Sequence, residues 1–210
     1  MLKKNISIVV GVLLIIAIGT GLLLSKKIIS SEEDNFRKSL KGEIVFSRRD
    51  GLYLNIYKIN ADGTGEKMLY HNPADISAYL PEWSEDGTKI YFTTVKDKKA
   101  RRFEMDTDGK NIRLATDKNF TLTVGNQISR EKDIIVELGN IYYLDKQNEK
   151  ILILPHKNFD PDLNSGAWEC SWSPDKKYII FELKGYITII NKEGTKIAKI
   201  TEGIEPDWKY

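Results

Sequence analysis

Residues 81–92 read PEWSEDGTKIYF, and residues 170–181 read CSWSPDKKYIIF. In both stretches a tryptophan is followed by a polar turn and then by an apolar segment that ends in phenylalanine. The turn contains Asp86-Gly87 in the first copy and Pro174-Asp175 in the second. These residue types favour tight turns because their backbone or side chains suit the dihedral angles that a turn needs. We therefore interpret the two stretches as copies of one structural repeat, in which two strands flank a short turn.

Similar apolar segments recur along the rest of the chain. Four of them end at residues 46, 92, 136 and 181, which are 46, 44 and 45 positions apart. Each is followed by a second segment with a turn of its own, in the ranges 56–63, 102–109, 141–148 and 187–194. A third apolar segment closes each repeat, in the ranges 67–70, 111–114, 151–154 and 196–200. Repeats of about 40–45 residues with four strands each are typical of β-propeller blades.

The local sequence within these segments favours strands. Residues 56–60, IYKIN, alternate between two faces, as half-buried strands do. Gly63, Gly109 and Gly194 each follow an acidic residue at a point where a tight hairpin needs a positive φ. The third repeat is the weakest, since its start at residues 127–129 lacks the tryptophan.

The two stretches quoted above resemble the PxWSPDGxxIxF repeat of TolB-like propellers, which also occurs in the propellers of prolyl oligopeptidase-type peptidases. The resemblance covers roughly residues 43–210. It implies an all-β fold. Together with the repeat count, it predicts a small β-propeller of four four-stranded blades, preceded by one transmembrane α-helix.

The two ends of the repeat region suggest how such a ring could close. The first repeat has no tryptophan segment before it, and the chain ends just after Pro206-Asp207-Trp208. We expect the C-terminal strand around Trp208 to complete the first blade and to close a ring of four. The alternative is that two chains pair their open ends into a larger ring.

Residues Ile6–Leu24 form a run of 19 uncharged residues. As a helix this run would be roughly 28 Å long, close to the thickness of a bilayer core. Lys3, Lys4, Lys26 and Lys27 flank it, and no small-x-small cleavage pattern follows. The sequence therefore predicts an uncleaved signal-anchor.

The domain organisation follows from that anchor. We expect an N-terminal transmembrane anchor at residues 1–27, a linker at 28–42 and the propeller domain at 43–210. The count of basic residues by itself favours a cytoplasmic propeller, but long domains translocate largely regardless of charge. We favour a single-pass protein of the cell membrane whose propeller is extracytoplasmic.

Charge and cysteine content exclude several classes of function. Without the four lysines around the apolar run, 28 basic residues stand against 30 acidic ones. This balance gives no reason to expect a nucleic-acid partner. A single cysteine, Cys170, excludes an internal disulfide framework and any multi-cysteine metal site.

Sequence motifs for catalysis, metal binding or nucleotide binding are absent, so we expect no catalytic residue, no metal and no cofactor. His71 and His156 follow third strands, where surface positions are expected. Residues 160–166, DPDLNSG, resemble a calcium loop, but the glycine falls at the seventh position and Ser171 occupies the twelfth. We interpret them as a polar turn.

The binding candidates are two aromatic and two acidic residues: Trp168, Tyr79, Asp160 and Asp162. Trp168 stands outside the repeat pattern beside an acidic loop, and exposed aromatic side chains can anchor a partner. The tryptophans at the repeat position (Trp83, Trp172 and Trp208) are expected in the core. Cys170 is expected to be a packed small residue.

Residues 96–102, KDKKARR, are the densest basic run, and we interpret them as a solvated hairpin. A second interpretation is contact with anionic lipids or cell-wall polymers.

These observations favour a non-catalytic module that binds a protein or another component of the cell envelope. The alternative is a glycan- or peptide-active hydrolase-type propeller, or its sensor or accessory subunit. That alternative would draw on acidic residues near the fourth repeat: Asp160, Asp162, Glu169 and Asp175. A purely structural role is a third possibility.

Overall fold

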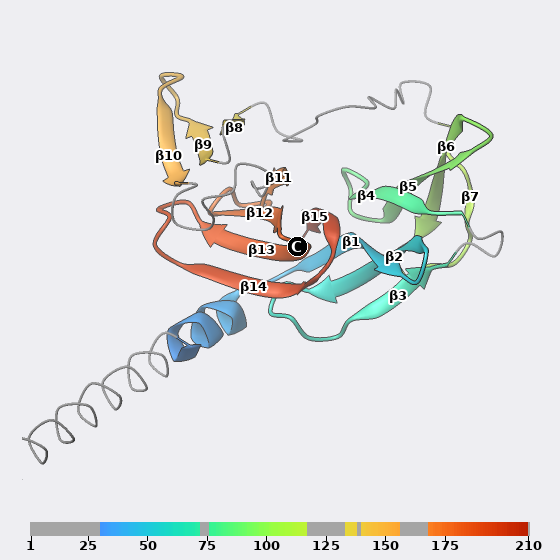
Figure 1. The fold of residues 1–210 in the computed structure, drawn as a ribbon, viewed down its shortest axis with the longest axis horizontal. Coiled ribbons are helices and arrows are strands. Elements are labelled where there is room, and N and C mark those ends of the chain that lie inside the picture. Colours follow the sequence, from blue (N-terminus) through green and yellow to red (C-terminus); the bar gives the residue numbers. More distant parts are fainter. Residues whose placement is uncertain (1–29, 72–75, 117–132, 138–139, 156–167, 210) are drawn as a thin grey trace, which may run out of the picture.

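The computed structural model describes residues 30–71, 76–116, 133–137, 140–155 and 168–209. In these residues the fold is all-β apart from one helix at residues 30–39 (Figure 1). The strands form four antiparallel sheets, one for each predicted repeat. This arrangement agrees with the prediction of a small propeller.

The first sheet has the order β15-β1-β2-β3 and contains β1 (Glu43–Asp50), β2 (Tyr53–Asn60), β3 (Lys67–Tyr70) and β15 (Ile204–Lys209). The second has the order β4-β5-β6-β7, with β4 (Ala78–Trp83), β5 (Lys89–Lys96), β6 (Lys99–Asp106) and β7 (Arg113–Leu114). The third has the order β10-β9-β8, with β8 (Ile134–Glu137), β9 (Asn140–Leu144) and β10 (Lys150–Leu154). The fourth has the order β11-β12-β13-β14, with β11 (Trp168–Trp172), β12 (Tyr178–Leu183), β13 (Tyr186–Asn191) and β14 (Ile197–Glu202). The innermost strand predicted for the third sheet, at residues 127–129, lies outside the described residues.

The C-terminal strand completes the first sheet. β15 runs antiparallel to β1, with Ile44 opposite Trp208 and Val45 opposite Asp207. This pairing confirms the prediction that the strand around Trp208 completes the first blade. It also covers an edge of β1 whose backbone groups would otherwise be open to another chain.

Apolar clusters fill three junctions between neighbouring sheets, and each contains one repeat tryptophan. Trp208 lies between the first and fourth sheets, Trp83 between the first and second, and Trp172 between the third and fourth. All three side chains are at most 9% exposed. The prediction that they are core residues is confirmed.

The described residues contain no such cluster between the second and third sheets. The face of the second sheet that points away from the first carries ion pairs instead: Lys89–Asp106, Arg102–Glu82 and Arg113–Glu104. A face whose charges are paired within one sheet gives little drive for apolar packing. The described sheets therefore form an arc in the order second, first, fourth, third (Figure 1). The predicted closure is confirmed at the seam between β1 and β15, and the junction of the second and third sheets stays a prediction.

The Trp-Ser-x-Asp pattern of the repeat forms the turn that was expected from it. Ser84 Oγ donates to Asp86 Oδ1 at 2.6 Å and accepts the backbone N–H of Lys89 at 2.9 Å. In the fourth sheet Ser173 Oγ donates in the same way to Asp175 Oδ1 at 2.7 Å. The serine and aspartate therefore replace backbone partners that the turn leaves without a strand neighbour.

The range predicted as a linker contains the helix at residues 30–39. Phe36 and Leu40, which are 7% and 2% exposed, join the apolar cluster between the first and fourth sheets. The Phe36 ring lies 5.9 Å from the ring of Tyr178. Phe36 near the end of the helix and Leu40 directly after it therefore hold the helix on the domain.

The apolar run Ile6–Leu24 lies outside the described residues. In the part of the chain that the structure describes, no helix has the length and apolar character that a membrane crossing needs.

Candidate functional site at the axial end

The innermost strands of three sheets share an unusual backbone conformation near their first residues. Leu80 in β4, Glu169 in β11 and Glu205 in β15 have φ values of 50°, 53° and 56°. Each lies three positions before the repeat tryptophan, and the strand pairing shifts register there. Residues other than glycine rarely adopt positive φ, and such strain gathers at functional sites. We call the end of the arc where β4, β11 and β15 begin the axial end.

Glu205 connects the first and second sheets at the axial end. Its Oε2 accepts hydrogen bonds from Ser47 Oγ and from the backbone N–H of Leu80, both at 2.6 Å. Further along β15, Asp207 Oδ2 accepts the backbone N–H of Trp83 at 2.8 Å. Carboxylates of β15 thus satisfy two backbone donors of β4, and hydrogen bonds to an ionised acceptor are stronger than neutral ones.

The structure places the two aromatic candidates at the same position of the repeat. Tyr79 directly precedes Leu80, and Trp168 directly precedes Glu169, each four residues before a repeat tryptophan. Tyr79 is half-buried, and its hydroxyl makes no hydrogen bond to a described residue. Trp168 belongs to β11 and lies opposite Glu182 of β12. The acidic candidates Asp160 and Asp162 lie outside the described residues.

Polar residues of β1, β5 and β12 lie opposite these positions in the first, second and fourth sheets. The sequence analysis did not predict this polar layer. Ser47 pairs with Ile204, Thr93 with Tyr79 and Glu182 with Trp168. Ser47 and Thr93 are almost fully buried. The available signal was a polar residue directly after the buried phenylalanine that ends three of the four apolar segments.

Glu182 is the titratable member of this layer. Burial raises the pKa of its carboxyl. The hydrogen bond that Oε1 accepts from the Gly185 N–H at 2.7 Å acts in the opposite direction and lowers the pKa by less. The axial end therefore presents the half-buried side chains of Tyr79 and Glu182 over a layer of buried hydroxyl groups. Such a surface can orient a polar ligand or a protein loop.

The remaining candidates that the structure describes form no second site. Cys170 is fully buried, and burial, followed by the charge of Glu169, raises the pKa of its thiol, so the prediction of a packed residue is confirmed. His71 is exposed after β3, with Nδ1 3.0 Å from Asn55 Oδ1. His156 and the calcium-like loop at 160–166 lie outside the described residues. Among the described residues, no three His, Cys, Asp or Glu side chains are grouped to hold a metal ion.

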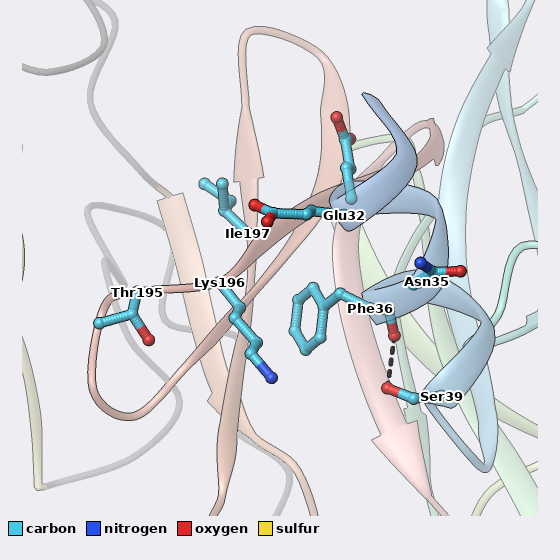
Figure 2. A pocket seen from close by; sticks show the side chains of 8 residues that line it. Glu32, Asn35, Phe36, Ser39, Thr195, Lys196 and Ile197 are labelled. Atoms are coloured by element: carbon cyan, nitrogen blue, oxygen red, sulfur yellow. Dashed lines mark hydrogen bonds between the residues drawn. The ribbon is translucent and has the colours of Figure 1, made fainter. Parts of the chain in front are cut away.

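An open crevice of about 610 Å³ lies between the helix at residues 30–39 and the β13–β14 hairpin (Figure 2). Phe36 points from the helix into this space (Figure 2). Two of the polar groups that line it are engaged within the protein, since Glu33 accepts the N–H of Lys199 at 3.1 Å and Ser39 donates to the Phe36 carbonyl at 2.6 Å. The crevice is open and belongs to one side of the fourth sheet, whereas the axial end joins groups of three sheets, so we take the axial end as the candidate site.

No family of known proteins and no curated protein matches the chain. Among solved structures, TolB from Acinetobacter baumannii is 14% identical, with 80% of this chain and 44% of that chain covered and a TM-score of 0.29. A TolB-type protein from Agrobacterium tumefaciens is 13% identical, with coverage of 78% and 64% and a TM-score of 0.31. A prolyl endopeptidase is 16% identical, with coverage of 79% and 29% and a TM-score of 0.29. The chain spans less than two thirds of the length of each of these proteins, and its assignment to four sheets rests on the strand pairing described above.

Proposed function

We propose that this protein is a membrane-anchored, extracytoplasmic and non-catalytic binding module of the TolB-like propeller type. It holds a protein or another component of the cell envelope at the axial end. The observation that carries the proposal is the position of Tyr79 beside the strained Leu80, with a hydroxyl that no described residue engages. A half-buried aromatic ring with an unused polar tip is a typical anchor for a partner.

The bonding of Glu205 supports binding over catalysis. Two donors of the protein itself already hold its carboxylate. A glycosidase needs two carboxylates that flank a substrate bond, free to accept or donate its protons. Glu169 occupies the position equivalent to Glu205, so a hydrolase-type site that uses it is the alternative to test.

Membrane attachment is proposed from the apolar run at residues 6–24 and from the helix that comes after it. The helix at residues 30–39 starts a few residues later and is fixed to the domain through Phe36 and Leu40. A span at residues 6–24 would therefore hold the propeller close to the bilayer rather than on a long flexible tether. Protease accessibility of the propeller on whole cells tests the proposed side of the membrane.

Site-specific photocrosslinking in intact membranes tests the proposed partner site. A photoreactive phenylalanine analogue at Tyr79 is expected to give a discrete crosslinked species. The matched control is the same analogue at Tyr142, a half-buried tyrosine of β9 in the third sheet. Equal products at both positions, or none at Tyr79, would contradict the proposal. Turnover of a glycan or peptide that is lost in Glu169→Gln would favour the hydrolase alternative.

A further inference from the structure

The hairpin between β5 and β6 carries cations that the protein leaves without partners. Lys96, Lys98, Lys99 and Arg101 are all exposed. Within the described part of the chain, no side chain of the four takes part in an ion pair, a hydrogen bond or a ring contact. The basic residues elsewhere on the strands are often paired, as Lys58 is with Glu43 at 2.6 Å.

This end of the hairpin extends beyond its own sheet. β4 pairs with β5 only as far as Thr94, and β7 pairs with β6 only from Phe103. The two strands then continue to Lys96 and Lys99, which lie directly opposite each other. Asp97 and Lys98 form the turn with φ values of 50° and 61°, the combination of a tight two-residue hairpin turn.

Three of the cations lie on one face of this two-stranded ribbon. Lys96 is opposite Lys99, and Arg101 is opposite Thr94, two positions along from Lys96. Residues two apart on a strand share a face. Opposed pairs have Cβ atoms about 5 Å apart, and diagonal neighbours about 7–8 Å apart. Like charges directly opposite each other destabilise a strand pair, and a bound anion would remove that repulsion.

The β1–β2 hairpin shows that the fold does not require these cations. It has the same length, and Asp50, Tyr53 and Asn55 occupy the positions of Lys96, Lys99 and Arg101. There the polar groups satisfy one another, because Asn55 Nδ2 donates to Asp50 Oδ2 at 3.0 Å and the Tyr57 hydroxyl donates to the same oxygen.

The hairpin points away from the end at which the helix at residues 30–39 joins the domain. Lys209 Nζ donates to the Gly87 carbonyl at 2.8 Å, and the Lys209 carbonyl lies against Gly42, which follows the helix. The β4–β5 turn and the start of β1 therefore lie at the same end of the domain, the end at which the helix joins it. The eight residues of β5 span about 25 Å, so the hairpin lies at the opposite end of the strand. Figure 1 shows β5 and β6 on the side of the molecule away from the helix.

We propose that the face formed by Lys96, Lys99 and Arg101 binds a linear polymer that carries phosphodiester groups, outside the membrane. The compact charge of lysine suits phosphate, and the row of cations suits an extended polyanion. The face has no aromatic or large apolar side chain of the kind that anchors a folded protein partner. Its distance from the helix disfavours the bilayer in which the anchor is expected. The location outside the membrane rests on the proposed function, whereas the charge pattern does not.

Binding of a poly(glycerol phosphate) oligomer to the full-length chain in neutral phosphatidylcholine nanodiscs tests this proposal. The test variant is Lys96→Gln with Lys99→Gln, and the control is Lys38→Gln with Lys146→Gln, two exposed lysines away from the hairpin. Each cation is expected to contribute about fivefold to the affinity, so the test variant, which lacks two, should bind on the order of 25-fold more weakly. The control is expected to bind like the wild type. The affinity should also fall linearly with salt on logarithmic axes.

Three results would overturn the proposal. The first is that the oligomer does not bind near physiological salt. The second is that both double variants lose the same amount of affinity, and the third is that poly-glutamate binds as tightly as the oligomer. Hairpin-dependent binding to phosphatidylglycerol nanodiscs but not to the oligomer would assign the face to a bilayer instead. The test variant is expected to melt no lower than the wild type, since it removes a like-charge pair. The crosslink at Tyr79 is expected to survive in this variant, so the two proposals can fail separately.

Discussion

Single side chains at the axial end connect sheets that are distant in sequence. Glu205 reaches Ser47 and Leu80, 158 and 125 positions away. This role was not readable from the sequence, because an acidic residue before Pro206 has no local partner that would reveal it. By contrast, Ser84 and Asp86 bond within their own turn, so the repeat motif alone was enough to predict the turn.

Glu205→Ala is expected to lower the free energy of unfolding by about 1–3 kcal/mol, because it leaves the Leu80 N–H without its acceptor. Glu205→Gln keeps an acceptor oxygen, so it should lower the free energy of unfolding by less than Glu205→Ala does. Thermal unfolding followed by circular dichroism measures both effects. Glu202→Ala, at an exposed position of β14, is the control and should change little. Equal losses for Glu205→Ala and Glu202→Ala would contradict the role given to Glu205.

The turn aspartate Asp86 is expected to make stability depend on pH. Hydrogen bonds from Ser84, and then from Thr88, lower its pKa to about 2. The ionised form is thus favoured in the folded state, so its contribution is present above about pH 4, the pKa range of a free carboxyl. That contribution is lost as the pH falls toward 2. The melting-temperature difference between wild type and Asp86→Asn should be present at pH 6 and shrink below pH 4. The control Asp97→Asn, at the β5–β6 turn, should change the melting temperature by less. If the melting-temperature difference for Asp86→Asn did not depend on pH, the role given to the Asp86 carboxylate would be refuted.

At the scale of elements, the C-terminal strand is the part whose place depended on the whole chain. The sequence indicated that a strand around Trp208 lacked a repeat behind it and that the first repeat lacked a strand before it. The pairing of β15 with β1 joins the two ends. Hairpins such as β5–β6 needed no such argument, because their turn residues and alternating side chains lie within one short segment.

Deletion of residues 204–210 is expected to cost several kcal/mol of stability. It removes a strand of the first sheet and leaves the N–H groups of Leu80 and Trp83 without acceptors. The point variant Trp208→Ala should by itself cost about 3–5 kcal/mol, because a large side chain is lost from the core. Chemical or thermal unfolding of the full chain is the measurement. An unchanged melting temperature after the deletion would show that β15 does not hold the first sheet.

At the scale of the whole molecule, stability is expected to differ between the middle and the ends of the arc. The first sheet packs on the second through one face and on the fourth through the other. The described residues of the third sheet join one apolar cluster, which they share with the fourth. Regions with fewer buried apolar contacts open at lower free energy.

Amide hydrogen exchange of the full chain measures this difference. Peptides from β8, β9 and β10 should exchange faster than those from β1 and β2. Peptides from the fourth sheet, which packs on both neighbours, serve as an internal standard for slow exchange. Uniform protection across the four sheets would mean that the junction of the second and third sheets is as tightly packed as the others.

The sequence alone determined the number of repeats, the strands within each and the burial of the repeat tryptophans. These properties depend on local turn chemistry and on a two-residue alternation that any short segment displays. Only the tertiary structure decided which groups meet at the axial end and that, among the described residues, the side chains of the β5–β6 cations have no partners. Such facts depend on neighbours supplied by other sheets, and a chain read residue by residue does not specify which distant group satisfies a given charge or backbone donor.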